Sequence, residues 1–376
     1  MRGFGSASNG LRETSGGWQG GDAARSAWNA FGGNVCVPIA ECGSRTPPPY
    51  GGDKGSAPLR DVNPRPLWVQ MMKTESQQKD NHITVCICTY KRPQLLKRLL
   101  NDLGDQETSG LFTFSIVVAD NDQLESAQPV VSAFADSSSI PVSYCVEARQ
   151  GICLVRNKAL EHSAGNFIAF IDDDEFPAKR WLLELFQACD REGVDGVLGP
   201  VLRHFDETPP QWVVKGNFYQ RPRHSTGFVL DWREGRTGNV LLKRRVFEPG
   251  EPPFDPQFHR GGDVDFFRRM TEKGRVFIWC DEAVVYEVVP PIRWTRTFML
   301  KRALLRGTIA SRRGPFRLRS IGKSVLAVPA YAVALPFAFV LGQHRFMKLL
   351  VKLCDHLGKI MAFVGLTPLK NEYATD

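Results

Sequence analysis

The sequence predicts an α/β fold with a doubly wound, mostly parallel central sheet flanked by helices, followed by an apolar and amphipathic helical region. Apolar, β-branched runs alternate with segments of helical spacing between residues 82 and 186. Polar clusters follow three of these runs, at Thr89–Arg92, Asp120–Asp122 and Asp172–Asp174. Because ligands of such sheets bind outside the carboxyl ends of the strands, we expect the functional site at this edge.

The first predicted strand is the β-branched run Ile83–Thr89. Pro93 then begins a helix, because the leucines that follow it recur at helical spacing; they are Leu95, Leu96, Leu99, Leu100 and Leu103. A second apolar strand, Phe114–Ala119, ends in three polar residues. A polar helix near 123–136 and a short strand near Val142–Val146 follow.

After a helix that carries Arg156, the apolar run from Phe167 ends abruptly in Asp172, Asp173, Asp174 and Glu175. Such carboxylates repel one another and are costly to desolvate unless a cation joins them, which favours a divalent metal site. The alternative is a solvated turn before a helix near Trp181–Phe186. We expect Glu175 to be a charge at the start of that helix.

The charge distribution indicates the class of binding partner, and the cysteines indicate the redox compartment. The net charge is +8, and basic residues concentrate between Arg293 and Lys323, beside an apolar segment. This arrangement favours an anionic membrane surface, and the sequence lacks the aromatic and basic modules typical of single-strand binders, so we expect no nucleic acid partner. The nine cysteines show no metal-binding spacing, which indicates core cysteines in a reducing compartment.

Composition divides the chain into three regions. Residues 1–79 are predicted to be a disordered leader, because the first 70 residues hold 13 of the 34 glycines and a Pro-Pro-Pro run. The leader lacks a continuous apolar segment and is not predicted to be a signal peptide; Met71 or Met72 is a candidate start. Residues 80–310 form the α/β domain, and 311–376 a basic and apolar helical tail.

The tail is predicted to contact a membrane. Ser324–Leu341 is eighteen residues without a charge, marginal against the roughly 20 that span a bilayer, and Pro329 and Pro336 should kink it. The next stretch, Phe346–Leu366, has an amphipathic pattern. We expect a re-entrant or in-plane hairpin; the alternative is that both helices cover the sheet of the α/β domain.

Five segments carry a family resemblance in this order: TVCICTYKRP, VVADND, ARQGICLVRNKAL, FIDDDEFP and GGDVDFFRR. Together they resemble a bacterial family-2 inverting glycosyltransferase with the GT-A fold, and WCDEAVVYEVVPPIRWTRTFMLKRALLRG resembles the branch that builds cell-surface and exopolysaccharides. The resemblance implies a nucleotide-sugar donor, a lipid-linked glycan acceptor, a Mn²⁺ or Mg²⁺ cofactor and a place at the cytoplasmic face of the cell membrane.

The resemblance also assigns residues in the first half of the domain. It implies Asp174 as the direct metal ligand, with Asp172 on the metal, its water or the ribose, and Asp173 free to take either role. The implied nucleotide-binding residues are Thr89, Tyr90, Arg92, Asp120, Asp122 and Arg156. Asp122 could instead cap a turn, and Arg156 could be a surface cation of its helix.

In the second half, the resemblance implies Asp263 as the base that takes the acceptor proton, with Asp265 as a further substrate contact. Gly262 stands where the family usually has Glu, so acceptor positioning must differ; both Asp residues could instead cap their helix. The stretch RTGNVLLKRRVF, residues 236–247, contains Gly238 and resembles the segment that lines the donor sugar in this family.

Later residues are candidates for acceptor or pyrophosphate contacts. Glu287 and the pair Arg293 and Arg296 fall in this group. Arg302 and Arg306, four apart, share a helix face. Arg302 is assigned to substrate, and the alternative for both is contact with anionic lipid.

The function predicted first is metal-assisted single displacement of a sugar onto a hydroxyl of a lipid-linked oligosaccharide or polysaccharide. Inversion requires a stabilised leaving group, an aligned acceptor and a base. One alternative is transfer directly to polyprenyl phosphate, which scarcely needs a base. The other is a non-catalytic, membrane-associated scaffold that binds the nucleotide sugar.

Overall fold

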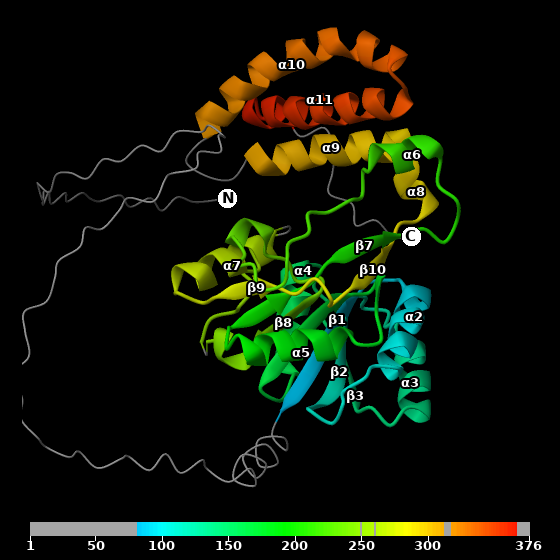
Figure 1. Cartoon of the computed structure of the whole chain (residues 1–376), viewed down its shortest axis with the longest axis vertical. Coiled ribbons are helices and arrows are strands. Elements are labelled where there is room, and N and C mark those ends of the chain that lie inside the picture. Colours follow the sequence, from blue (N-terminus) through cyan, green and yellow to red (C-terminus); the bar gives the residue numbers. More distant parts are fainter. Residues whose placement is uncertain (1–80, 249, 259–260, 312–316, 367–376) are drawn as a thin grey trace, which may run out of the picture. The chain divides into compact units, whose positions relative to one another are not determined.

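The computed structural model describes residues 81–248, 250–258, 261–311 and 317–366. The predicted leader, residues 1–79, and the candidate starts Met71 and Met72 lie outside these described residues. A seven-stranded sheet organises the described domain, with the strand order β3-β2-β1-β4-β8-β6-β9 (Figure 1). Its strands are β1 (His82–Thr89), β2 (Thr113–Asp120), β3 (Val142–Val146), β4 (Phe167–Asp172), β6 (Gly196–Leu198), β8 (Val240–Lys243) and β9 (Phe277–Trp279).

The register of the parallel strands brings the predicted polar clusters together. Strand β1 pairs in parallel with β2 and with β4, so that Thr89 lies opposite Asp120 and Cys88 opposite Asp172. Strand β8 enters between β4 and β6 and runs antiparallel to both. Its pairing of Val240 with Phe170 brings the preceding residues to the tip of β4. The predicted α/β class and mostly parallel sheet are thus confirmed.

Helices cover both faces of this sheet. One face packs against α2 (Pro93–Gly104), α3 (Gln128–Ser137) and α5 (Trp181–Arg191), and the other against α4 (Ile152–Glu161) and α7 (Gly262–Glu272). The leucines of α2 at 96, 99, 100 and 103 are fully buried, as their spacing predicts. The helix expected near 123–136 begins only at Gln128, because the carboxylate of Asp120 binds the backbone N–H of Ala127 in the preceding turn.

A smaller sheet lies beside the first and has the order β5-β10-β7. Its strands are β5 (Glu175–Pro177), β7 (Val201–His204) and β10 (Val285–Val288). The expectation that Glu175 starts a helix is wrong: Glu175 begins β5, is almost fully buried and pairs with Glu287 of β10. Helix α5 starts only at Trp181.

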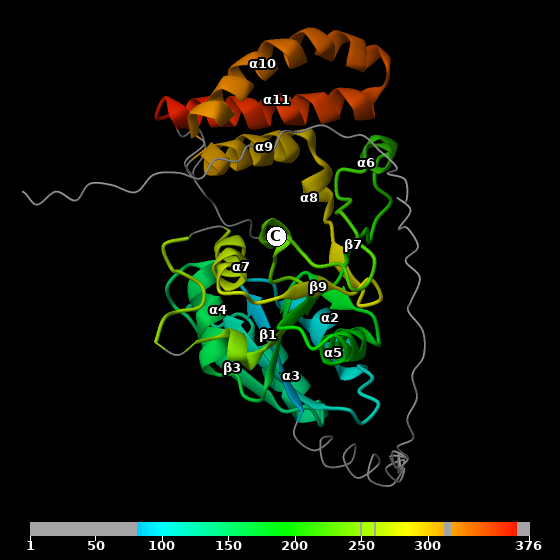
Figure 2. The same ribbon diagram turned by 60° about the vertical axis from the view of Figure 1, so that its left-hand side comes forward.

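Helix α6 (Gln211–Gly216) lies between β7 and β8 in the chain. After β10 the described chain is helical and comprises α8 (Pro291–Trp294), α9 (Arg296–Ser311), α10 (Arg317–Val340) and α11 (Gln343–Phe363). Helices α9 and α11 approach so closely that a Cβ on Gly307 or Gly358 would collide with backbone oxygen of the other helix. Figures 1 and 2 both show α10 and α11 side by side, with α10 arching over its partner.

Helix α10 is apolar enough to cross a membrane over Ile321–Val340, and it is the one such helix in the described ranges. Only 11% of that window is buried by the rest of the protein. Large side chains such as Leu326 and Phe337 point to solvent on it. The alternative in which this helix covers the sheet is therefore not what the structure shows, and an apolar C-terminal helix is left available for a membrane.

Candidate active site

Four consecutive carboxylates lie at the carboxyl edge of the large sheet. Asp172 is the last residue of β4, Asp173 and Asp174 form the turn, and Glu175 opens β5. Solvent reaches 46% of the Asp172 side chain but only 8% and 11% of those of Asp173 and Asp174. Asp172 is consequently the carboxylate most open to a ligand.

Residues at the carboxyl end of β1 donate hydrogen bonds to Asp173 and Asp174. The hydroxyl of Thr89 donates to Asp173 at 2.8 Å, and the guanidinium of Arg92 donates to Asp173 at 3.2 Å and to Asp174 at 3.4 Å. Thr89 is buried, so its hydroxyl is fixed by the sheet register that places β1 beside β4. The predicted residues at these two strand tips thus contact one another directly.

A second arginine reaches the same carboxylates from the opposite side. Arg293 of α8 donates to Asp174 at 2.9 Å and to Glu287 at 3.1 Å. Glu287 also accepts from Arg221, which lies in the loop after α6. Because Glu287 pairs with Glu175 across the small sheet, these ion pairs join both sheets at the acidic edge.

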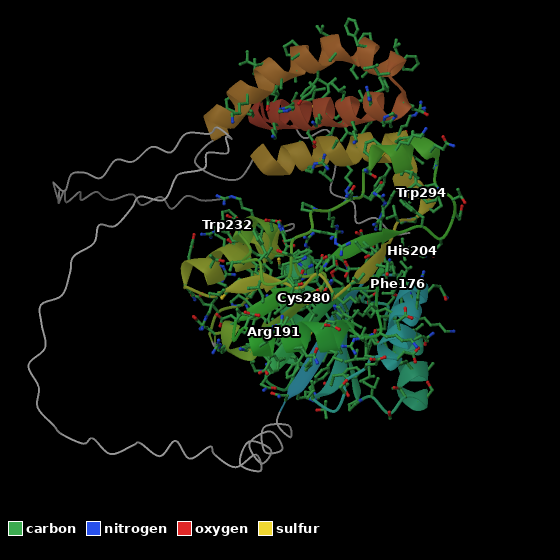
Figure 3. The ribbon with its side chains drawn as sticks, in the orientation of Figure 1. Phe176, Arg191, His204, Trp232, Cys280 and Trp294 are labelled. Atoms are coloured by element: carbon green, nitrogen blue, oxygen red, sulfur yellow. The ribbon has the colours of Figure 1, made fainter. Side chains whose placement is uncertain are left out.

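An apolar cluster holds Arg293 in place. Its neighbour Trp294 packs edge-on against Phe205, and the hydroxyl of Tyr219 donates to the backbone oxygen of Arg293. Figure 3 labels Trp294 on this side of the small sheet, with the contacting rings of Phe176 and His204 nearby. The buried tryptophan therefore sets the direction in which its neighbouring guanidinium points.

Burial and like charge make this edge costly to keep fully ionised. Burial and the neighbouring Asp174 raise the pKa of Asp173 to about 7, although Arg92 opposes the increase. Desolvation raises the pKa of Asp172 to about 6. The positive charge of Arg156 opposes this increase, and the negative charges of Asp174 and Glu287 add to it. Burial, Asp172 and Asp174 raise the pKa of Glu175 well above its ordinary value. A cation that joined these carboxylates would relieve this repulsion.

The backbone of Gly238 lies close against two carboxylates of the acidic edge. A Cβ at this position would lie 2.9 Å from Oδ2 of Asp172 and 2.9 Å from Oε1 of Glu175. Any larger residue at this position would therefore press on the oxygens of Asp172 and Glu175. The following Asn239 is fully buried, and its side chain bonds Trp181 and the backbone oxygens of Pro200 and Ala283, which fixes the loop.

The residues present fit a hard divalent cation. Among the described residues, no group of three or more His, Cys, Asp or Glu side chains is arranged as a metal site. Mg²⁺ and similar ions are commonly held by one or two carboxylates, with phosphate oxygens and water completing the shell. The exposed carboxylate of Asp172 and the carboxylate of Asp174, two residues further on, supply that donor type.

The carboxylates of Asp120 and Asp122, at the end of β2, accept hydrogen bonds from other groups of the protein. Asp120 is fully buried and accepts from the N–H groups of Asp122 and Ala127 and from the hydroxyl of Tyr144, each at 2.9 Å. Asp122 accepts from the N–H of Leu124, the turn-capping geometry expected as its alternative. These contacts shape the loop that follows β2, next to Thr89 in the sheet register.

Two further predicted residues line the same edge. Arg156 of α4 is buried, lies 3.8 Å from Asp172 and sits over the ring of Phe254, so it is not a solvated surface cation. Tyr90 follows Thr89, and the ammonium of Lys91 lies over its ring. Both arginines of the first half, Arg92 and Arg156, thus face the carboxylates of the β4 tip.

Helix α7 carries the predicted base. Asp263 lies in its first turn, and its carboxylate accepts from the N–H of Val264. Asp265 accepts from Arg268 and Arg269 at 2.9 Å each, within its own helix. The missing Glu has a local cause: a Cβ at Gly262 would lie 2.3 Å from the sulfur of Cys153, so the close packing of α7 on α4 leaves no room for a side chain.

Arg302 is placed apart from the acidic edge. It lies on α9 and lines a cavity with Arg306 and Glu287. Our sequence analysis did not single out two arginines that lie nearer: Arg221, which pairs with Glu287, and Arg236. Burial and Arg221 lower the pKa of Arg236, against the opposing charges of Glu175 and Asp263. Both arginines lie in irregular loops without periodic signal, and only the position of Arg236 just before Thr237 and Gly238 hinted at a role.

Comparison with known proteins identifies what this arrangement resembles. The model of the family described as "Glycosyl transferase family 2" matches residues 84–248. The succinoglycan biosynthesis protein ExoM of Rhizobium meliloti (strain 1021) is 32% identical over 229 residues, which cover 60% of this chain and 73% of that protein. The glycosyltransferase AglE of Haloferax volcanii is 23% identical over 199 residues, 51% of this chain and 62% of its own length, which is under two thirds.

A solved structure supports the fold. The mannosyltransferase PcManGT from Pyrobaculum calidifontis, in complex with GDP-Man and Mn²⁺, superposes with a TM-score of 0.50 at 17% identity. The match covers 79% of this chain and 93% of that one. At this identity the likeness concerns the fold alone.

Proposed function

This chain belongs to glycosyl transferase family 2, and we propose that it moves a sugar, with inversion, onto a hydroxyl of a lipid-linked oligosaccharide or polysaccharide. As a member of the family it is a glycosyltransferase that uses a nucleotide-sugar donor. The observation that carries the finer proposal is the edge at which Asp172–Asp174 face Arg92, Arg156 and Arg293. A diphosphate needs this combination of fixed positive charge and metal-binding carboxylates.

The arginines suit the leaving group. Arg92 and Arg293 both bind Asp174, and their guanidiniums are of the kind that binds diphosphate oxygens. A Mn²⁺ or Mg²⁺ ion on Asp174 and Asp172 would neutralise charge that develops on the leaving nucleoside diphosphate. Thr89, Tyr90, Asp120 and Asp122 shape the two strand tips beside it, where we place the nucleoside, and Asp173 fixes Thr89.

Asp263 is the residue we assign as base. It lies in the first turn of α7, where its carboxylate accepts from the N–H of Val264. Acceptor positioning cannot use a Glu at 262, and we assign that task to Arg236, which directly precedes Thr237 and Gly238 in the loop beside Asp172 and Glu175. Asp265, bound to Arg268 and Arg269, is assigned to keeping the helix start in place.

The acceptor class rests on the relative and on the tail. ExoM is named for succinoglycan biosynthesis, which supports an exopolysaccharide acceptor carried on a lipid. The exposed apolar helix α10 supports contact with the membrane. The basic residues beside it suit the anionic cytoplasmic surface, where nucleotide sugars are available.

A transfer assay tests the proposal. The full-length protein in mild detergent receives radiolabelled uridine, guanosine or thymidine diphosphate sugars with Mn²⁺ and either a polyprenyl-diphosphate-linked oligosaccharide or polyprenyl phosphate alone. We expect label on the oligosaccharide, its loss in Asp263→Asn, and normal transfer by Asp190→Asn, a change at an exposed residue of α5. Transfer to polyprenyl phosphate alone would contradict the assignment, and so would full activity of Asp263→Asn.

A further inference from the structure

A cavity of about 160 Å³ lies between the loop after α6 and the helices α9 and α11. Its wall includes Tyr219, Arg221, Glu287, Arg302, Arg306 and Val351. One water needs only about 10–15 Å³ of such space, so a diphosphate group fits. The wall combines residues from the small sheet and from the helices of the apolar tail.

Positive charge is in excess around this cavity. Arg221 and Arg293 both pair with Glu287, and Arg306 pairs with Asp355 of α11. Arg302 is exposed, and within the described ranges no carboxylate lies within ion-pair distance of it. Together with Asp174, which Arg293 also binds, three carboxylates face these four guanidiniums, and an excess of one positive charge remains at Arg302.

The arginine that lacks a carboxylate has an environment that would favour an anion. Desolvation and the positive charges of Arg293 and Arg306 lower the pKa of Arg302, against the opposing charge of Glu287, and an anion bound between these groups would raise it. Arg302 and Arg306 lie one turn apart on α9, so both can contact the same ligand. The hydroxyl of Tyr219 is already used by the backbone of Arg293, which leaves the guanidiniums as the main donors.

The cavity lies between the two parts that a lipid-linked acceptor must touch. On one side, Glu287 is joined through Arg293 to Asp174 at the donor edge. On the other, α11 provides Val351 and packs against the exposed apolar helix α10. The close approach of Gly307 and Gly358 fixes α11 on α9 and thus the width of the cavity.

We propose that this cavity binds the lipid-attached phosphate groups of the acceptor, with Arg302 and Arg306 as the principal contacts. This inference rests on the proposed function, because it assumes an acceptor carried on a polyprenyl diphosphate. The same chemistry could be offered by the headgroup of an anionic phospholipid. Arg302 and Arg306 lie one turn apart and can together contact several phosphate oxygens, which favours a diphosphate over a singly charged diester.

The test compares Arg302→Gln with Lys301→Gln, an exposed neighbour on α9 that does not line the cavity. The full-length protein is titrated with phosphatidylcholine vesicles that contain polyprenyl diphosphate, phosphatidylglycerol at equal charge, or neither. We expect Arg302→Gln to weaken binding to polyprenyl diphosphate vesicles about tenfold more than Lys301→Gln does. With phosphatidylglycerol both variants should show the same small loss, and inorganic diphosphate should compete only when Arg302 is present.

Two results would overturn the proposal. Equal losses for both variants on every vesicle would indicate general surface attraction and no site. An Arg302-dependent loss as large with phosphatidylglycerol as with polyprenyl diphosphate would assign the cavity to phospholipid headgroups. Thermal stabilisation by nucleoside diphosphate and Mn²⁺, measured on the same samples, should be retained by Arg302→Gln; its absence in the wild-type protein would refute the donor site independently of the lipid result.

Discussion

The guanidinium of Arg293 lies 2.9 Å from the carboxylate of Asp174, and its other nitrogen reaches Glu287 of the small sheet. Both side chains of the first pair are nearly buried. Removing one partner of such a pair leaves a charge without compensation, so the contact fixes where each group points before any ligand arrives. The residue assigned to the metal and a candidate diphosphate contact are thus positioned by one another.

Replacement of Arg293 by Lys tests this bridge. The ammonium keeps the charge but cannot bind both carboxylates in the forked geometry of a guanidinium. We expect the Kd for the nucleoside diphosphate to rise about tenfold or more, measured by calorimetry with Mn²⁺. Arg191→Lys, at an exposed position on α5, should bind as the wild type does. Unchanged affinity in Arg293→Lys would remove this residue from the donor site.

Gly238→Ala tests the close contact of this loop with the carboxylates. The added methyl would lie 2.9 Å from oxygens of both Asp172 and Glu175 and would press on them. We expect nucleotide binding with Mn²⁺ to fall at least tenfold in a protein that retains its circular dichroism spectrum. Gly104→Ala is the control, because its methyl would make only ordinary contacts with Phe134. If Gly238→Ala binds nucleotide normally, the position of these oxygens does not decide nucleotide binding.

The contact between Gly262 and Cys153 should show energetic coupling. A methyl at Gly262 would lie 2.3 Å from the cysteine sulfur, so Gly262→Ala should destabilise the protein by about 1–3 kcal/mol. Cys153→Ala removes the sulfur, and the double variant should recover much of the loss in urea unfolding. Strictly additive effects would show that the two helices adjust without contact at this point.

Asp281 should stabilise the loop that carries Arg221 in a pH-dependent way. Arg223 binds its carboxylate with two hydrogen bonds at 2.9 and 2.7 Å and lowers the pKa of Asp281. A lowered pKa stabilises the fold above the ordinary value of about 3.9, and this contribution is lost as the pH falls through the folded-state pKa.

Asp281→Asn should therefore lower the free energy of unfolding by up to about 1 kcal/mol at pH 7, since the pair is partly exposed. The difference from wild type should shrink below about pH 4. Urea unfolding across this range, with Asp136→Asn on α3 as control, measures it. A difference that stayed constant with pH would mean that the charge of Asp281 does not matter.

The strand tips could be predicted from the sequence, because local patterns encode them. The apolar runs before Thr89, Asp120 and Asp172 end where β1, β2 and β4 end, and their parallel register follows from the fold class. The same logic failed for Glu175, because β5 exists only through pairing with β10, far along the chain. No local pattern reports such a pairing.

The partners of the site residues were the harder part. Arg221 and Arg236 come from irregular loops, and their contacts depend on where the small sheet sits. The absence of Glu at 262 was visible in the sequence, but its cause, the sulfur of Cys153 on another helix, was not. Non-local packing decided each of these features, whereas periodicity reports only on neighbours along the chain.

The most direct measurement is a thermal-shift comparison of the full-length wild-type protein and Asp174→Asn with uridine, guanosine and thymidine diphosphates, each with and without Mn²⁺. A ligand at 100 times its Kd adds about 2.7 kcal/mol to the stability of the folded protein. We predict a Mn²⁺-dependent increase in Tm for one of the nucleotides, retained by Asp190→Asn and lost in Asp174→Asn. An equal increase in Asp174→Asn, or no increase in the wild type with any nucleotide, would contradict a metal-assisted donor site at the acidic edge.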